Sequence, residues 1–222
     1  MQGQTPPAAK PKATFLPDWA YQTAQHPKKD TEIRTPSTLG GAKALPGQGE
    51  NTQTAMERGT ALHLLLEHLP NLPQAAWPAA APEIASLAPQ FDLDFEALLE
   101  EATQVLTTPH LAHVFGPDAL AEVEITAPSA TLGTDLLGVI DRLLVSDDRV
   151  TAVDFKTNTV VPDRAEDVPE GILRQMGAYA EMLAQVYPGR EIEVALLWSK
   201  TATLMVSPHD LVSEALQRAR GA

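Results

Sequence analysis

The spacing of apolar residues changes part-way along this chain, from a helical repeat to strict alternation. Leucines recur three or four residues apart over about 54–69, which predicts a helix, and residues 94–106 predict another. From about residue 121 the period becomes two, the spacing of a strand with one buried face. Strands are therefore predicted over about 121–127, 134–146 and 150–157. Because the helices precede the strands, the chain is expected to form a helical part followed by a sheet.

The rest of the pattern completes this sheet. Residues 147–149 are predicted to form a hairpin turn between two of the strands. A helix over about 170–187 leads to a strongly apolar, central strand over about 190–199, and a short strand and a last helix follow. Shorter helical segments are predicted near 83–87 and 109–116. This order predicts a mixed β-sheet flanked by helices, of α/β or α+β class, with an N-terminal helical part.

The N-terminal quarter has a different composition. Seven prolines fall within the first 50 residues, so residues 1–52 are interpreted as a Pro-rich linker or tail, with a short helix considered near 17–25. The ordered domain is predicted to span 53–222, divided into a helical part over 53–116 and a sheet core over 117–222. Such an opening is typical of the cut end of a longer chain.

Composition excludes several classes of protein. The chain has 222 residues and no cysteine, which rules out a disulfide framework, a thiolate zinc site and a cysteine-held iron–sulfur cluster. It also lacks a run of about 18 apolar residues and the apolar core of a signal peptide. We therefore expect a cytoplasmic protein without a membrane partner.

The net charge of −13 is distributed unevenly. Residues 1–50 carry six Lys/Arg against four Asp/Glu, and residues 51–222 carry ten against twenty-five. Proteins that bind nucleic acid tightly by themselves are usually basic, so this charge disfavours a stand-alone DNA binder. It is compatible with an enzyme that approaches DNA through divalent cations, or with a module that receives the strand from another domain.

Three charged residues, Asp141, Asp154 and Lys156, lie on the predicted hairpin. Asp154 and Lys156 lie two residues apart and share a strand face, and alone they are best explained as a solvated ion pair. Asp141, however, interrupts an otherwise apolar strand and is predicted to lie opposite Asp154 across the hairpin. A divalent cation relieves the repulsion between two such carboxylates, and oxygen ligands suit Mg²⁺ or Mn²⁺. Lys156 would then point at the same pocket and bind a phosphate.

Four motifs in this order carry a family resemblance. The stretches GVIDRL, VDFKTN and RQMGAYA, preceded by GTALHLLLE, resemble the RecB-type nuclease domain of the PD-(D/E)xK, restriction-endonuclease-like superfamily. The resemblance covers about 57–198, implies the restriction-endonuclease-like fold and makes 117–222 the catalytic core. It implies catalytic roles for Asp141, Asp154, Lys156, Gln175 and Tyr179, and metal ligation by His63, Asp141, Asp154 and the backbone carbonyl of Phe155.

Within that superfamily the chain is most similar to the C-terminal nuclease domain of the AddA helicase–nuclease subunit. The resemblance implies a DNA exonuclease dependent on Mg²⁺ (or Mn²⁺), acting in double-strand break repair and recombination. The chain has no GxxxxGK[ST] loop, so the ATPase and helicase would reside in other domains of the parent chain. The implied partners are those helicase domains, an AddB-like subunit, and DNA delivered as single strands by the motor.

Less specific interpretations apply to each residue taken alone. His63 on a leucine-rich helix is usually a histidine at the core's edge, Tyr179 is usually core, and Gln175 is an ordinary helix residue. Glu124 is either within reach of the metal or part of a solvated face, and Gly138 is expected to let another chain or a ligand approach. Two other functions fit the pattern: a catalytically silent nuclease-fold module for DNA guidance or subunit contact, and a metal-dependent hydrolase acting outside nucleic acids.

Overall fold

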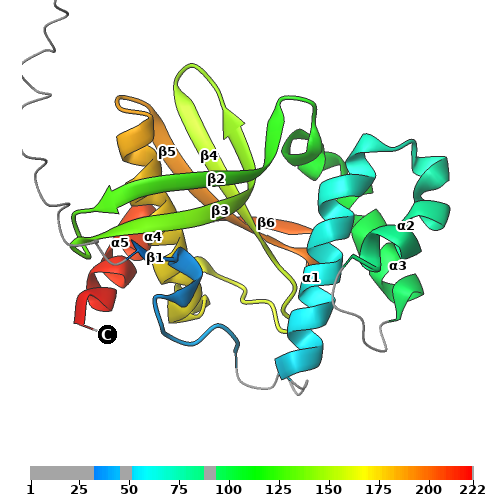
Figure 1. The fold of residues 1–222 in the computed structure, drawn as a ribbon, viewed down its shortest axis with the longest axis horizontal. Coiled ribbons are helices and arrows are strands. Elements are labelled where there is room, and N and C mark those ends of the chain that lie inside the picture. The colour runs from blue at the N-terminus through cyan, green and yellow to red at the C-terminus, as the bar shows by residue number, and fades with distance from the viewer. Residues whose placement is uncertain (1–32, 46–51, 88–93, 222) are drawn as a thin grey trace, which may run out of the picture. The chain divides into compact units, whose positions relative to one another are not determined.

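The computed structural model describes residues 33–45, 52–87 and 94–221 (Figure 1). The strands are β1 (Ile33–Arg34), β2 (Ala119–Ser129), β3 (Thr134–Val145), β4 (Arg149–Lys156), β5 (Glu191–Trp198) and β6 (Thr203–Ser207). The α-helices are α1 (Thr52–His68), α2 (Trp77–Ala85), α3 (Phe95–Thr107), α4 (Glu170–Val186) and α5 (His209–Arg218). Short 3₁₀ segments include η2 (Pro36–Thr38), η5 (Pro109–Phe115) and η7 (Ser199–Thr201).

The strands form one mixed sheet in the order β1-β3-β4-β5-β6, with β2 paired to the other edge of β3. β1 runs parallel to β3, and β4 runs parallel to β5, while the remaining neighbours are antiparallel. Helix α4 makes the crossover that a parallel β4–β5 pair requires. β5 lies between two strands and is buried from Val194 to Trp198, which agrees with its uninterrupted apolar sequence.

β3 and β4 separate part-way along their length. They pair only from Arg142–Val153 to Val145–Val150, next to the hairpin turn in which the Ser146 N–H donates to the Arg149 carbonyl. Beyond that point β3 pairs with β1, whereas β4 continues beside β5. The sheet therefore opens into a fork between β3 and β4.

Two hydrophobic cores cover the two faces of the sheet. The α4 core combines α4 and α5 with one face of the strands and includes Leu136, Ile140, Ile172, Met176, Leu183 and Leu196. The α1 core combines α1, α2 and α3 with the other face and includes Leu62, Leu65, Leu66, Leu98, Phe155 and Leu197. Helices α4 and α5 pack closely because Gly177 has no side chain, as a Cβ there would lie 2.3 Å from the Val212 carbonyl oxygen.

The predicted fold class is confirmed, because the structure is a mixed sheet flanked by helices. The hairpin, the central strand and the helix over 170–187 are also confirmed, each within about two residues. The short helix expected near 83–87 is instead the end of α2. That helix begins at Trp77, because alanine favours the helix and a proline in the first turn removes no hydrogen bond from within it.

The interpretation of residues 1–52 as a linker is wrong for 33–45. These residues form β1 and η2, and Leu39 is buried in the α4 core. β1 has only two residues, which is too short a strand to be recognised from alternation, and its pairing with β3 depends on tertiary context. The helix considered near 17–25 lies outside the described residues. Among the described helices, none is both long enough and apolar enough to cross a bilayer.

Candidate active site

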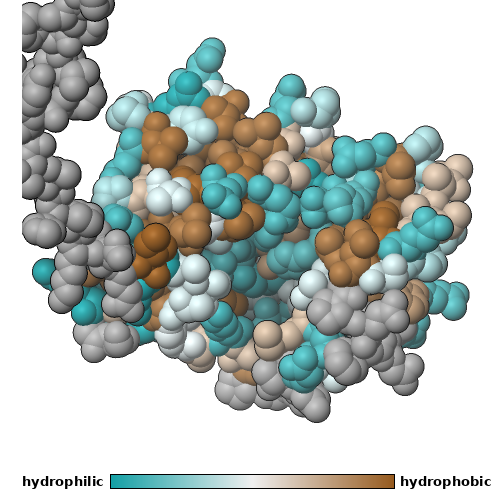
Figure 2. Space-filling view, viewed as in Figure 1, coloured by the Kyte–Doolittle hydropathy of each residue, from teal (hydrophilic) through white to brown (hydrophobic). Residues whose placement is uncertain are grey.

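A cavity of about 790 Å³ lies at the fork between β3 and β4 and brings all of the predicted site residues together. α1 provides one wall, α4 another, and the segment around η2 a third (Figure 1). Figure 2 shows the hydrophilic hollow near the centre of the same view. The predicted site residues that line it are His63, Asp141, Asp154, Phe155, Lys156, Gln175 and Tyr179.

Asp141 stands where β3 changes its alternation. Ile140, just before Asp141, belongs to the α4 core. Strict alternation would place the next core residue two positions later, but that residue is Leu143, three positions later, so the alternation shifts by one residue. The β2–β3 ladder skips the position where Glu122 would face Asp141, and Glu122 has a positive φ of 48°. This local distortion places the Asp141 carboxylate at the boundary between the two cores.

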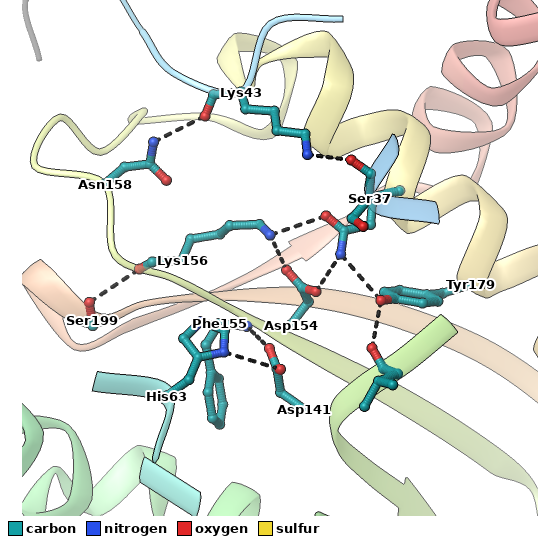
Figure 3. A network of polar contacts seen from close by, with 12 residues as sticks. Ser37, Lys43, His63, Asp141, Asp154, Phe155, Lys156, Asn158, Tyr179 and Ser199 are labelled. Atoms are coloured by element: carbon teal, nitrogen blue, oxygen red, sulfur yellow. Dashed lines mark hydrogen bonds and ion pairs between the residues drawn. The ribbon is translucent and has the colours of Figure 1, made fainter. Parts of the chain in front are cut away.

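From that boundary Asp141 contacts both α1 and β4. Its Oδ2 accepts a 2.5 Å hydrogen bond from the Phe155 N–H, and its Oδ1 lies 3.3 Å from His63 Nδ1 (Figure 3). The His63 ring in turn packs edge-on against Phe155, with centroids 5.5 Å apart. His63 remains 34% exposed at its side chain, whereas Asp141 is 10% exposed.

Asp154 and Lys156 form an ion pair inside the cavity (Figure 3). Both also bond the side-chain amide of Gln175. Gln175 Nε2 donates to Asp154 Oδ1 at 2.8 Å, and Lys156 Nζ donates to Gln175 Oε1 at 3.2 Å. The amide therefore bridges the two charges and fixes their separation. Taken alone in the sequence, the two residues suggest a solvated ion pair. The ion pair is present, but it is not solvated, because the side chains of Lys156 and Asp154 are only 16% and 5% exposed.

Tyr179 extends this network to β3. Its hydroxyl accepts from Gln175 Nε2 at 3.2 Å and donates to the Val139 carbonyl at 2.6 Å. The Tyr179 ring can come this close because the neighbouring residue is Gly138, where a Cβ would lie 2.8 Å from Tyr179 Cε1. The close approach expected at Gly138 is therefore made by Tyr179 and Pro36 of the same chain.

The pKa values of the three acid–base groups shift in different directions. Burial raises the pKa of Asp154, and this outweighs the opposing charge of Lys156. Burial also acts to raise the pKa of Asp141, but the hydrogen bond and charge of His63 and the Phe155 N–H lower it overall. For His63, burial lowers the pKa, and the hydrogen bond and charge of Asp141 reverse this to a net rise. Asp141 is therefore the carboxylate that stays ionised most readily.

Comparison with known proteins agrees with this geometry. The family model described as the PD-(D/E)XK nuclease superfamily matches residues 37–219. The chain belongs to the PD-(D/E)XK nuclease superfamily. No curated protein sequence matches the chain. A solved structure described as "Crystal structure of SSO0001" is similar at 12% identity and a TM-score of 0.33, covering 76% of this chain and 85% of that one.

Membership of this superfamily implies a nuclease-type domain that uses a divalent metal. The described residues contain no group of three His, Asp or Glu side chains arranged as a metal site. Their chemistry nevertheless fits such an ion, because Asp141 and Asp154 are buried and supply hard oxygen donors. Asp154 Oδ2 is buried and, within the described part of the chain, accepts no hydrogen bond, although Lys156 is its ion-pair partner.

The predicted backbone ligand also has a suitable orientation. In an extended strand the N–H and C=O of one residue point to the same edge. The Phe155 N–H reaches Asp141 on β3, so the Phe155 carbonyl points into the fork as well. The next carbonyl, of Lys156, points the other way and accepts from Ser199 Oγ at 3.2 Å. The metal-ligand roles of His63 and these groups stay predictions of the resemblance.

Some residues near the site were not identified from the sequence. Lys43, from the segment interpreted as a linker, lines the cavity, and no local pattern could have indicated it. The charge of Asp141 reaches Glu122, which does not line the cavity: burial raises the pKa of Glu122, and the charge of Asp141 raises it further. Glu124 faces Val139 in the β2–β3 ladder and does not line the cavity.

Proposed function

We propose that this PD-(D/E)XK domain hydrolyses phosphodiester bonds in DNA with the help of Mg²⁺ or Mn²⁺. The observation that supports this most directly is the meeting of Asp141, Asp154 and Lys156 in one cavity at the fork of the sheet. Two buried carboxylates repel each other unless a cation or a proton intervenes. A lysine beside them, with a side chain only 16% exposed, adds a donor for a phosphate oxygen. Metal-assisted phosphodiester hydrolysis uses groups of this kind.

The residues have distinct roles in this proposal. His63, Asp141, Asp154 and the Phe155 carbonyl would hold the cation. When bound, the cation supplies a Lewis acid that activates water and offsets the charge of the phosphate. The Phe155 N–H keeps Asp141 in place, and Gln175 keeps the Asp154 carboxylate and the Lys156 ammonium at a fixed separation. A preorganised site of this kind needs little rearrangement during the reaction.

Lys156 would change partners when substrate enters. Its ammonium is paired with Asp154, and its side chain is only 16% exposed. With Asp154 engaged in holding the cation, Lys156 would be available to donate to a phosphate oxygen. Tyr179 keeps its proton throughout, because burial and the charge of Asp154 raise its pKa. It therefore acts by positioning Gln175 rather than by transferring a proton.

We further propose that the strand is supplied by other parts of an AddA/RecB-type helicase–nuclease. The similarity of the four sequence motifs to the AddA nuclease domain supports this assignment, as does the strongly acidic charge of the chain. An acidic domain attracts DNA weakly by itself, so delivery by a helicase motor with an AddB-like subunit would raise the local concentration of the strand. Double-strand break repair and recombination would be the setting, and cutting would proceed exonucleolytically.

Cleavage of a labelled single-stranded oligonucleotide in Mg²⁺ tests the proposed function. We expect Asp154→Asn and Asp141→Asn to abolish cleavage while Asp210→Asn, on a fully exposed side chain of α5, leaves it unchanged. Unchanged cleavage by Asp154→Asn would refute the site. A wild-type chain that binds Mn²⁺ through Asp154 but cuts no DNA, alone or with its helicase domains, would favour the catalytically silent alternative.

A further inference from the structure

Hydrogen bonds from helix α4 hold the segment 39–44 beside the cavity. The Ala42 carbonyl accepts from the Gly171 N–H at 2.7 Å, at the start of α4. The Leu39 carbonyl accepts from Arg174 Nη1 at 3.1 Å. These bonds and the burial of the Leu39 side chain in the α4 core fix the course of the backbone here.

The backbone of Lys43 is also held by the loop that follows β4. Its carbonyl accepts from Asn158 Nδ2 at 3.0 Å, in the loop that follows β4 (Figure 3). Both residues line the cavity together with Lys156. The backbone of Lys43 is thus tied to the strand that carries Asp154 and Lys156, and its side chain is presented to the same space.

Lys43 forms no ion pair within the described part of the chain, although the charge of Asp154 reaches it. Its ammonium donates to the Ser37 carbonyl, and among the described residues it forms no ion pair with a carboxylate. Lys156, by contrast, is paired with Asp154. The ammonium of Lys43 therefore faces the cavity without a carboxylate paired to it in the described part of the chain.

The two ammonium groups also affect each other. Burial lowers the pKa of Lys43, the charge of Lys156 lowers it further, and the charge of Asp154 opposes both. Two cations that repel across a cavity favour an anion between them. A cation bound to Asp154 would increase this preference, because it would add positive charge on the side of Lys156.

We propose that Lys43 binds a backbone phosphate of the nucleic acid strand in this cavity, as a second phosphate contact beside that of Lys156. This inference rests on the proposed function, because it takes the substrate to be a phosphodiester chain. The contact positions the strand between α1 and the segment 39–44. Since it reaches a phosphate and no base, it contributes affinity without sequence preference.

Salt-dependent binding to a single-stranded oligonucleotide, measured by fluorescence anisotropy in Ca²⁺, tests this inference without turnover. Lys43→Met should weaken binding about tenfold at low salt. It should also reduce the slope of log K against log[salt] by about 0.7, the value for one phosphate contact on a single strand. Lys43→Arg should restore the slope, because it keeps the charge. The matched control is Lys200→Met, on an exposed lysine in η7 outside the cavity.

Two results would overturn the inference. One is a slope of log K against log[salt] that is the same for Lys43→Met and Lys200→Met, because the effect would then come from the change in net charge alone. The other is a wild-type chain that shows no binding at low salt. Either result is distinct from a failure of the proposed function. If binding depends on Lys43 but no cleavage occurs in Mg²⁺, the inference stands and the nuclease activity does not. If cleavage depends on Asp154 but Lys43→Met binds DNA normally, the nuclease activity stands and the inference about Lys43 fails.

Discussion

The two faces of the sheet contribute to the site by different means. On the α4 face, Gln175 and Tyr179 form a buried chain of hydrogen bonds that runs from Lys156 and Asp154 to the Val139 carbonyl. On the α1 face, the contact is a single 3.3 Å approach between His63 and Asp141, and His63 is one-third exposed. One face holds its groups in a rigid network, and the other presents one side chain at the edge of solvent.

This difference suggests a division of labour. In the proposed function, the α4 face would set the geometry of the carboxylate and the lysine, and with it the rate of the chemical step. His63, as the metal ligand that the sequence resemblance predicts, would govern metal occupancy from the α1 face. Variants of the two faces should therefore fail in different ways, and the following predictions test that distinction.

The largest effect is expected from Lys156, which Gln175 and Asp154 hold on the α4 face. Lys156→Met keeps most of the side-chain volume but removes the donor to the phosphate. We expect Mg²⁺-dependent cleavage to fall by about 10²–10³-fold, the range for loss of one preorganised electrostatic contact. Single-turnover kinetics with saturating DNA give this number. Lys200→Met should retain wild-type rates, and an equal loss in both variants would show that only overall charge matters.

The α1 face is tested by His63→Gln. Loss of groups that only orient a metal ligand costs about 10–100-fold in metal affinity, so loss of a ligand itself should cost about 100-fold. The concentration of Mn²⁺ needed for half-maximal cleavage should rise by this factor, and excess Mn²⁺ should restore the rate. His68→Gln, five residues along the same segment and 39% exposed, is the control. A lost rate that excess Mn²⁺ does not restore would contradict an occupancy role.

The α4 face is tested by Gln175→Leu. This change removes the bridge between Asp154 and Lys156, and we expect about a 10–100-fold loss of rate. Because the defect lies in geometry, excess Mn²⁺ should not restore the rate. Gln185→Leu, on the same helix with an exposed side chain, should have no such effect. Full rescue of Gln175→Leu by Mn²⁺ would erase the distinction between the two faces.

Much of this site could be predicted from the sequence, because the residues that form it are related by local sequence patterns. The hairpin turn fixes the register that brings Asp141 near Asp154, and the spacing of Gln175 and Tyr179 places both on one side of a helix. Alternation and helical periodicity suffice to predict these relations. The same patterns are sufficient for the mixed sheet and its central strand.

Other features depend on tertiary context. The shift of alternation at Asp141 accompanies a positive φ at Glu122 on the neighbouring strand. Glutamate is not a residue type that predicts a positive φ, so the sequence does not indicate this shift. Lys43 reaches the cavity because Leu39 is buried and Gly171 bonds Ala42, contacts between segments more than 120 residues apart. Local propensity cannot predict contacts of this kind, and a proline-rich composition argued against them.

The smallest effect concerns the start of α4, which anchors the rigid face. Glu170 accepts from Arg218 on α5 through both carboxylate oxygens, at 2.9 and 3.0 Å, and from Arg174 at 3.3 Å. The hydrogen bonds from Arg218 are the main reason that the pKa of Glu170 lies below its ordinary value, and burial opposes them. A lowered folded-state pKa stabilises the protein above the ordinary pKa, and the effect disappears as pH falls through the lowered value.

Glu170→Gln should therefore reduce the free energy of unfolding by about 0.2–1 kcal/mol at pH 7, as expected for a partly exposed ion pair. The difference from wild type should close as pH falls through the lowered folded-state pKa of Glu170, because the carboxylate is then protonated in both states. Urea unfolding at pH 7 and at a series of acidic pH values measures it. Glu214→Gln, whose exposed carboxylate lies 3.8 Å from Arg218, should show a smaller difference. A Glu170→Gln deficit that persists at low pH would mean that packing, and not charge, fixes the start of α4.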